Sequence, residues 1–391
     1  MSNVPLSYLI AAHVGVHSAM AGLRMATPLL GLSLGYGTDV VGYLVALFAV
    51  SQIVLAIPAG RFADRHGLRL PLSCAAMMAS AGTGLAVAWP ALPALCIAAL
   101  CLGGAVGLSL ITLQRHIGRT SESEEQLRRG LAWLSIAPSM SIFVGPLLAG
   151  LVIDALSFRA AFAVLGLLPL GAWLAARRSP GLLAGQAQRQ RSGSPWSLWR
   201  KPAFRDLLLL NWLMTASWDL HGFMVPVLGH ERGLSASWIG ILLSLFALAA
   251  TFSRLAVPAL ARRAPEWMIV AGAVTLAAII LGVYPLIGNV FVMALCSFLL
   301  GALLGSIQPS VMILLHRIVP AHRQGDAIAM RLMMVNASGI SMPLLFGIAG
   351  AWITVAGVFH ATAAIVTLGG SIGLVRGRRL STLPKASSNP E

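Results

Sequence analysis

The sequence predicts an all-α membrane protein with twelve transmembrane helices arranged as two pseudo-symmetric six-helix halves. Of its 391 residues, 58% are hydrophobic and only 10% are charged, whereas soluble domains carry roughly 25% charged residues. Apolar stretches of the ~20 residues needed to cross a bilayer recur along the chain. Glycine and proline positions in the first half also return in the second. These three observations together predict the fold class.

The apolar stretches give both the expected spans and the expected domains. The twelve spans cover residues 8–34, 40–59, 71–89, 92–114, 131–153, 158–176, 206–229, 236–257, 267–287, 290–315, 328–351 and 354–375. The domains are an N-terminal half at 1–176, a cytoplasmic linker at 177–205, a C-terminal half at 206–375 and a cytoplasmic tail at 376–391. The linker is rich in Gly, Ser, Gln and Arg, which is typical of a flexible connection.

A shift of 198 residues aligns the two halves. The aligned pairs are Pro28 with Pro226, Gly31 with Gly229, Gly35 with Gly233, Gly42 with Gly240, Gly103 with Gly301, and Gly107 with Gly305. With a slip of one residue, Pro146 falls on Pro343. Such coincidences over nearly 200 residues are not expected by chance. A parallel repeat of this kind places a binding site between the halves, near the middle of the membrane.

The net charge of +15 would suggest a nucleic-acid partner in a soluble protein. Here 24 of the 27 Lys and Arg residues lie in segments expected on one side of the membrane, the exceptions being Arg24, Arg159 and Arg232. This is the positive-inside asymmetry. It predicts a multi-pass protein of the cell membrane with both termini in the cytoplasm and no nucleic-acid partner. The ratio of 25 Arg to 2 Lys is typical of a GC-rich bacterial genome, which suggests a bacterial inner membrane.

The sequence lacks the patterns of an enzyme or a metal protein. Its four cysteines, Cys74, Cys96, Cys101 and Cys296, lie in apolar runs without metal-ligand spacing. Small helix-packing residues are the simpler interpretation. There is also no glycine-rich phosphate loop and no nucleophile paired with a base. We therefore expect no enzymatic activity, no metal and no cofactor.

A polar run between the second and third spans carries the first motif. Gly60, Asp64, Arg65, Gly67 and Arg69 have the spacing G-x-x-x-D-R-x-G-x-R. This run resembles the loop signature of the major facilitator superfamily of secondary transporters, although Leu68 replaces a usual basic residue.

The resemblance implies that Asp64 docks against a helix end in the other half and steadies the outward-open state. The alternative is a positive anchor that only sets the topology. In the second half, the corresponding loop, Ser253 to Arg263, keeps Arg254 but has Arg262 in place of the aspartate.

The fifth span contains Gly145-Pro146-Leu147-Leu148-Ala149-Gly150. This run resembles the G-P-x-x-G-G element of proton-driven exporters in the same superfamily. Proline bends a helix and glycine lets a neighbour pack closely. Ala149 departs from that pattern, and the fourth span lacks the coupling arginine usual in such exporters. An ordinary kinked packing helix is the alternative.

Ionisable groups at membrane depth are functional candidates because burying them is costly. His13, His17 and Arg24 share one face of the first span, which we expect to line a cavity, although His13 alternatively lies at the inner interface. Asp219 is the only carboxylate near the middle of a predicted span. We expect Asp219 to couple transport to protons, alternating between Arg24 and a proton. The alternative is a static lock between Asp219 and Arg24.

Further polar groups complete the candidate substrate site. Trp212 and Thr215 share the face of the seventh span that carries Asp219, and Gln308 and Asn336 lie near mid-depth in later spans. We interpret a further set as anchors at the cytoplasmic interface: Arg115, His116, His316, Arg317 and Arg331.

The leading functional prediction is proton-coupled efflux of small amphipathic compounds by alternating access. One alternative is a proton-linked transporter of a small organic anion, which Arg24 and the histidine face favour. An alternative of another class is a non-transporting membrane sensor or assembly partner on the same fold. The expected partners are a small-molecule substrate, protons and the lipid bilayer, and we expect a monomer.

Overall fold

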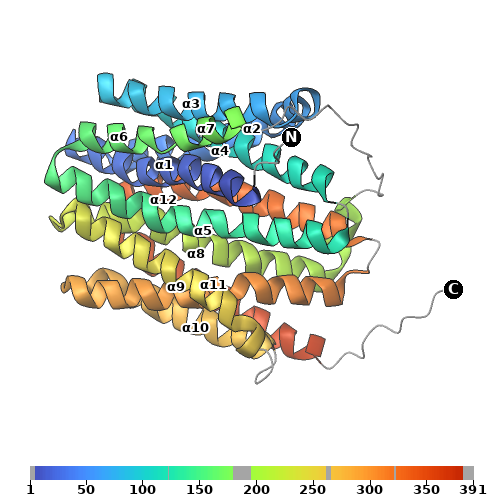
Figure 1. Ribbon diagram of the computed structural model, residues 1–391. Coiled ribbons are helices and arrows are strands. Elements are labelled where there is room, and N and C mark those ends of the chain that lie inside the picture. Colours follow the sequence, from blue (N-terminus) through green and yellow to red (C-terminus); the bar gives the residue numbers. More distant parts are fainter. Residues whose placement is uncertain (1–4, 122, 179–194, 261–265, 321–322, 382–391) are drawn as a thin grey trace.

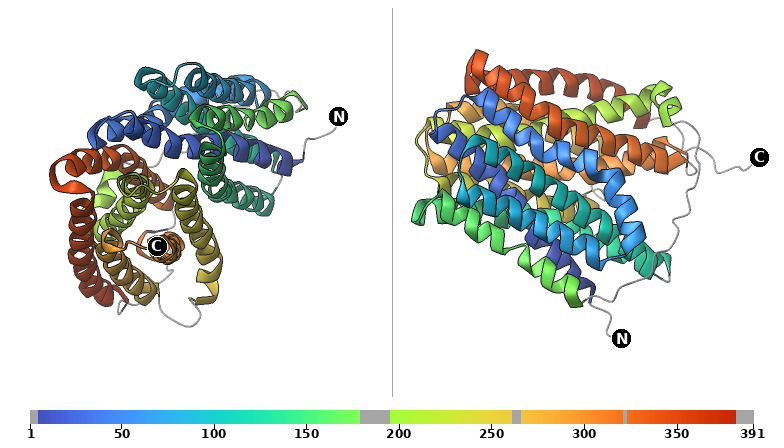
Figure 2. Two further views of the ribbon diagram at one scale, coloured as in Figure 1. Left: turned by 90° about the vertical axis from the view of Figure 1, so that its left-hand side faces the viewer. Right: turned by 90° about the horizontal axis from the view of Figure 1, so that it is seen from above.

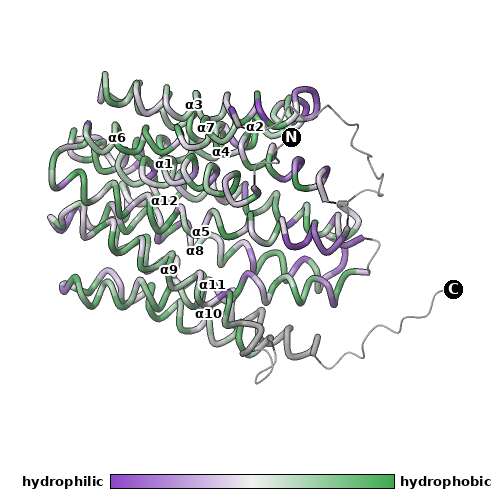
Figure 3. Tube along the Cα trace, viewed as in Figure 1, coloured by the Kyte–Doolittle hydropathy of each residue, from purple (hydrophilic) through white to green (hydrophobic). Residues whose placement is uncertain are grey.

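A computed structural model describes residues 5–121, 123–178, 195–260, 266–320 and 323–381. Within these ranges the chain is a bundle of long helices lying side by side, without a strand (Figure 1). Short turns such as Leu34–Gly37 join the helices at one end, which we call the turn end. The opposite end, where α2 finishes at His66, carries most of the arginines and more of the hydrophilic residues (Figure 3). We call it the basic end.

The helices follow one another along the chain with few interruptions. The first part contains α1 (Leu6–Ser33), α2 (Thr38–His66), α3 (Arg69–Ala88), α4 (Leu92–Thr120), α5 (Glu124–Ala155), α6 (Phe158–Leu167) and α7 (Leu170–Arg178). The second part contains the 3₁₀ helix η1 (Pro195–Arg200), α8 (Pro202–Glu231), α9 (Ala236–Leu260), α10 (Glu266–Val283), the 3₁₀ helix η2 (Tyr284–Leu286), α11 (Val290–Ile318) and α12 (Gln324–Ser381).

The all-helical membrane fold is confirmed, whereas the count of twelve spans stays a prediction. Among the described residues, ten helical stretches are long and apolar enough to cross a membrane. The predicted span 206–229 corresponds to α8, which is not among them and which carries Asn211, Asp219 and His221. The last two predicted spans, 328–351 and 354–375, both fall within α12, on either side of an interruption at Thr354.

Two predicted spans contain breaks with a visible cause. Inside α12, Thr354 has a φ of 67° and a ψ of 160°, so the helical geometry is interrupted where the two predicted spans meet. The backbone N–H of Gly357 donates to Thr354 Oγ1 (3.3 Å), which caps the segment that follows. The predicted span 158–176 is divided into α6 and α7 around Pro169, which lacks a backbone donor.

The predicted repeat is visible in the packing of glycines within each half. Gly103 of α4 lies against the backbone carbonyl of Phe48 in α2. At the same 198-residue shift, Gly301 of α11 lies against the backbone carbonyl of Phe246 in α9. Small residues let membrane helices approach closely, because no side chain separates their backbones. Each half therefore contains the same close helix crossing.

The repeat also governs how the halves meet. Gly42 of α2 lies against the carbonyl of Pro343 in α12, and Gly240 of α9 lies against the carbonyl of Pro146 in α5. We call these two contacts, α2 with α12 and α5 with α9, the two seams. Viewed along the helices, the first-part helices gather on one side and most second-part helices on the other (Figure 2).

Hydroxyl groups reinforce both seams near the turn end. Thr38 Oγ1 donates to the carbonyl of Gly347 (3.0 Å), and Ser237 Oγ donates to the carbonyl of Gly150 (3.3 Å). Gly150 and Gly347 are equivalent positions at a shift of 197 residues, the same slip that relates Pro146 to Pro343. The acceptors of the two hydrogen bonds are thus equivalent, whereas the donor Ser237 lies one position beyond the counterpart of Thr38.

The predicted domain boundaries stay predictions. Residues 179–194 of the predicted linker and 382–391 of the predicted tail lie outside the described residues. The helix α12 continues to Ser381 and so includes the first residues of the predicted tail. No helix-breaking proline occurs between Pro343 and Ser381.

We predict that Gly103→Leu destabilises the protein, because a side chain there would displace the backbone of α2. Overpacking of this kind typically costs about 1–3 kcal/mol. Thermal unfolding of the detergent-purified protein, followed by size-exclusion chromatography, measures the effect. Gly84→Leu on α3 is the matched control, because a Cβ at Gly84 meets no atom within 4 Å. Equal melting temperatures for the two variants would contradict this account.

Candidate functional site

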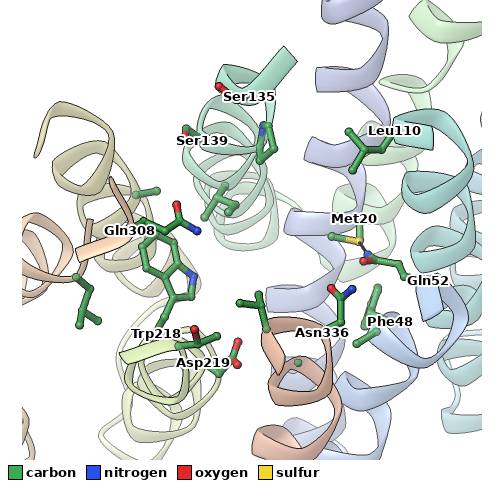
Figure 4. A pocket seen from close by; sticks show the side chains of 18 of the residues that line it. Met20, Phe48, Gln52, Leu110, Ser135, Ser139, Trp218, Asp219, Gln308 and Asn336 are labelled. Carbon is green, nitrogen blue, oxygen red and sulfur yellow. Dashed lines mark hydrogen bonds between the residues drawn. The ribbon is translucent and has the colours of Figure 1, made fainter. Parts of the chain in front are cut away.

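A cavity of about 630 Å³ lies between the two halves. Eight helices line it: α1, α2, α4 and α5 from the first half, and α8, α9, α11 and α12 from the second. Figure 4 shows Trp218 beside Gln308 on one wall, and Met20 beside Gln52 on another. Gln52 Nε2 donates to Met20 Sδ at 3.3 Å. The lining is therefore mainly apolar, with a few polar groups placed among hydrophobic side chains.

The cavity is displaced toward the basic end. Its lining includes Gln114 and Arg254, which lie within two helical turns of the ends of α4 and α9. In the other direction it reaches only to Arg24, Phe48 and Asp219, about 14–18 Å of helix short of the turn end. The two seams occupy the space between the halves beyond that depth.

Arg24 and Asp219 meet in the cavity wall and link the halves. Arg24 Nη2 of α1 lies 3.7 Å from Asp219 Oδ1 of α8. Ser338 Oγ of α12 donates to the other carboxylate oxygen at 2.8 Å. The Asp219 side chain is only 10% exposed, whereas Arg24 is 34% exposed. Among the described lining residues, Asp219 is the one carboxylate, so the ion pair predicted from the sequence contains the main acidic group of the cavity.

Three other predicted site residues also line the cavity. They are Thr215 of α8, Gln308 of α11 and Asn336 of α12. The hydroxyl of Thr215 donates to the carbonyl of Asn211, one turn earlier (2.8 Å). Its hydrogen-bonding capacity toward the cavity is therefore that of an acceptor.

Two predicted site residues, His17 and Trp212, lie outside the lining. Trp212 packs against the hydrophobic core. The His17 ring lies 5.6 Å from the ring of His13, whose Nδ1 is 2.7 Å from Ser109 Oγ of α4. The helix face that meets the cavity at Arg24 is thus covered by α4 at His13. Helical periodicity gives the face but not the neighbour, and this is why the histidine prediction differs from the structure.

The structure adds one arginine to the cavity wall and a second directly beside it. Arg254 lies in α9 and lines the cavity, although its motif context suggested a loop. Its Nη1 donates to Ser139 Oγ (3.0 Å), and its guanidinium carbon lies 5.5 Å from the centroid of a Trp218 ring. The predicted span 236–257 already contained Arg254, so this signal was present in the sequence.

The second arginine is Arg331 of α12, which the sequence suggested as an interface anchor. Its Nε donates to Asn211 Oδ1 of α8 at 3.0 Å. Asn211 lines the cavity, as does Val335, one turn after Arg331 on the same helix. Nothing in the order of residues indicates this contact, because 120 positions separate its two partners.

The polar run at residues 60–69 is helical rather than a loop. The helix α2 continues to His66, and α3 begins at Arg69, so only Gly67 and Leu68 form the turn. No residue between 60 and 66 breaks a helix. Gly67 has a φ of 69°, a conformation that glycine adopts without strain. The glycine of the motif therefore ends the helix.

Asp64 makes its contacts within the first half. Its carboxylate accepts hydrogen bonds from Arg115 and from Arg119 Nη2 (2.8 Å), both on α4. Gly60 faces the Arg115 guanidinium, and a Cβ at Gly60 would lie 3.0 Å from it. Arg65 and Arg69 are exposed. In this structure Asp64 thus anchors α2 to α4, whereas the resemblance implies contact with the other half in the outward-open state.

A carboxylate that docks on a helix end across the halves is found at Asp154. At the turn end of α5, its Oδ1 accepts the backbone N–H of Ala236 (3.0 Å) and its Oδ2 that of Ser237 (2.7 Å). These are the first residues of α9, whose free N–H groups and positive dipole favour a carboxylate. Nothing in the sequence indicates this cap, because Asp154 directly follows the predicted fifth span and has no motif around it.

Gly145 and Pro146 join α5 to a helix on either side. Gly145 lies against the backbone of Ser18 and Gly22 in α1, and the carbonyl of Pro146 lies against Gly240 in α9. The element is therefore a packing centre for one seam. The run that resembles the exporter motif makes close backbone contacts with both neighbouring helices in this structure.

A bundle of apolar helices in which two related halves enclose a cavity with apolar and polar lining residues is the architecture of a membrane transporter. The sequence profile of the Major Facilitator Superfamily matches residues 9–288 and 207–390. The chain belongs to this superfamily and is a multi-pass membrane protein. No curated protein sequence matches it.

Solved structures agree with the fold at low sequence identity. A bacterial homolog of the human lysosomal transporter Spinster, in an inward-facing and occupied conformation, is 13% identical with a TM-score of 0.78, and 100% of each chain is covered. A POT family transporter in complex with 5-aminolevulinic acid is 14% identical (TM-score 0.78, 96% of each chain). The nucleoside transporter NupG is 13% identical (TM-score 0.76, 96% of this chain and 100% of that one).

We predict that Asp154→Ala opens the turn end more often, because it removes the cap of α9 supplied by the other half. Losing such a cap costs about 0.5–2 kcal/mol. The expected result is a severalfold faster maleimide labelling of a cysteine introduced at Gln52 when reagent is added from the turn end. Asp39→Ala is the matched control, since Asp39 lies in the first turn of α2. Equal labelling rates in the two variants would contradict the role of this cap.

Proposed function

We propose that the chain is a secondary active transporter that moves small amphipathic compounds out of the cell by alternating access, coupled to protons. The observation that carries this proposal is the cavity between the halves with the Arg24–Asp219 pair in its wall. Its mixture of apolar side chains and a few convergent polar groups is typical of small-molecule sites. The similar solved structures are those of transporters, and this supports a general function in transport.

The arrangement of the seams supports an inward-facing state. Both seams join the halves toward the turn end, and the cavity extends toward the basic end. The positive-inside rule assigns the arginine-rich end to the cytoplasm. Transport then requires the seams to part while the basic end closes. Asp64, now paired with Arg115 and Arg119, would be available in that opposite state for the docking that the family resemblance implies.

Proton coupling is assigned to Asp219. When charged, Asp219 attracts Arg24 across the boundary between the halves, while Ser338 holds its second oxygen. Protonation would remove that attraction and allow α1 and α8 to separate. Because the Asp219 carboxylate would bind either the Arg24 guanidinium or a proton, its protonation state would be linked to the relative position of the halves. A static lock would require the same geometry but would not respond to protons.

The transport of an organic anion is the second candidate. It is favoured by Arg254, a further cation in the cavity wall that has no carboxylate partner among the described residues. A non-transporting sensor on the same fold predicts that no solute moves.

We predict that Asp219→Asn abolishes proton movement but leaves solute exchange. The amide preserves the size and polarity of the side chain yet cannot bind and release a proton. Purified protein in liposomes, with an internal pH-sensitive dye, is exposed to a lipophilic cationic dye and to benzoate in turn. We expect solute-induced proton flux in the original protein and none in the variant, with radiolabelled counterflow retained in both.

Glu124→Gln is the matched control, because Glu124 is 84% exposed at the start of α5. Proton flux that persists in Asp219→Asn would refute the coupling role. A variant that loses counterflow and thermal stability together would favour the static lock. Silence of the original protein with every solute would favour the sensor.

A further inference from the structure

Arg254 lines the cavity toward its basic end, and Arg331 lies beside the cavity, hydrogen-bonded to the lining residue Asn211. Their hydrogen bonds go to neutral oxygens, those of Ser139 and Asn211. Neither arginine forms an ion pair with a carboxylate in the part of the chain that the structure describes. Positive charges at membrane depth are rare and normally have a partner. Two such groups without one are therefore unexpected for a purely structural role.

The charges of the cavity wall do not balance. A buried charge loses stability unless an opposite charge neutralises it. Among the described lining residues, Arg24 and Arg254 are cations and Asp219 is the one carboxylate, which Arg24 already neutralises. The excess positive charge of the lining is thus at Arg254, and Arg331 adds a second positive charge beside the lining residue Asn211.

Unused hydrogen-bond donors accompany this charge. Among the described residues, Arg254 Nε and Asn211 Nδ2 are buried and have no acceptor. A buried donor without an acceptor costs roughly 1–3 kcal/mol. One donor belongs to Arg254 itself, and the other belongs to Asn211, the residue that accepts the hydrogen bond from Arg331. An anionic group with several oxygen atoms would supply the missing acceptors and the missing charge together.

We propose that Arg254 and Arg331 form an anion-binding subsite of the cavity, which takes the carboxylate of a small amphipathic anion. This inference rests on the proposed transport function and narrows its substrate class. Arginine binds carboxylates through two parallel hydrogen bonds, which gives both strength and orientation.

The apolar part of the anion has a platform next to the subsite. Trp218 directly precedes Asp219, its ring centroid lies 5.5 Å from the guanidinium carbon of Arg254, and its ring meets Phe246 edge-on with centroids 4.6 Å apart. Met214 and Leu304 line the same cavity. A ring stacked in this region would have its carboxylate at Arg254 and its body directed toward Asp219. The anion and the proton would then be bound within one cavity but at different groups.

Benzoate binding tests the subsite without any need for transport. The purified full-length protein in a neutral detergent is titrated with benzoate, benzamide and benzylamine, and binding is followed by calorimetry and thermal unfolding. We expect saturable binding of benzoate alone. Arg254→Gln and Arg331→Gln should each weaken it at least tenfold, which corresponds to about 1.4 kcal/mol. Arg254→Lys should retain part of the affinity, because it keeps the charge.

Arg128→Gln is the matched control, because Arg128 is 80% exposed at the basic end of α5. Size-exclusion profiles identify variants that fail to fold. For these, the comparison of benzoate with benzamide on the original protein and on Arg254→Lys still decides the question. Benzoate affinity that is unchanged in both glutamine variants would overturn the proposal, as would equal binding of benzamide.

An anionic lipid headgroup could bind the same guanidinium groups, so nanodiscs provide a separate arm. Stabilisation by phosphatidylglycerol but not by benzoate, dependent on Arg254, would overturn the assignment to a substrate.

Flux assays separate this proposal from the transport function. Arginine-dependent binding of benzoate without flux of any solute would support the subsite and refute transport. Flux of cationic or neutral solutes without benzoate binding would support transport and refute the subsite.

Discussion

Close approach of helix backbones at glycine is the constraint on which the rest of this structure depends. Apolar side chains in a membrane already contact apolar lipid, so the hydrophobic effect does not drive helices together. Tight packing and polar contacts hold them together instead. Gly42 and Gly240 bring the backbones of opposite halves together at the seams. With the halves fixed there, the remaining gap between them becomes the cavity, and Arg24 can reach Asp219 across it.

The sequence contains enough information for the fold and for part of the site. The apolar spans indicate the helices, and the Gly and Pro repeat indicates two related halves, because both patterns can be found in the sequence itself. The pairing of Arg24 with Asp219 was also predictable, since the repeat assigns them similar depths. Long-range partners were not: Asp154 on α9 and Arg331 on Asn211 depend on which helices become neighbours. Local periodicity likewise could not show that α4 covers His13.

The repeat governs packing, whereas the cavity departs from it. Where Gly103 and Gly301 make the same contact in both halves, Asp219 aligns with Ala21, Gln308 with Leu110 and Arg254 with Ala56. Most charged and amide groups of the wall therefore belong to the second half. The glycine contacts that bring backbones together recur in both halves, whereas most polar groups of the cavity wall occur once. Departures from the repeat are consequently a guide to the site.

The seams have a consequence for the origin of the architecture. At the 198-residue shift, α9 corresponds to α2, and the first part of α12 corresponds to α5. The α2–α12 seam and the α5–α9 seam are therefore one contact made twice, with the roles of the halves exchanged. Such an isologous surface is self-complementary and closes about a twofold axis, as in a symmetric dimer. A six-helix unit bearing it would pair with its own copy, and fusion into one chain leaves each copy free to diverge.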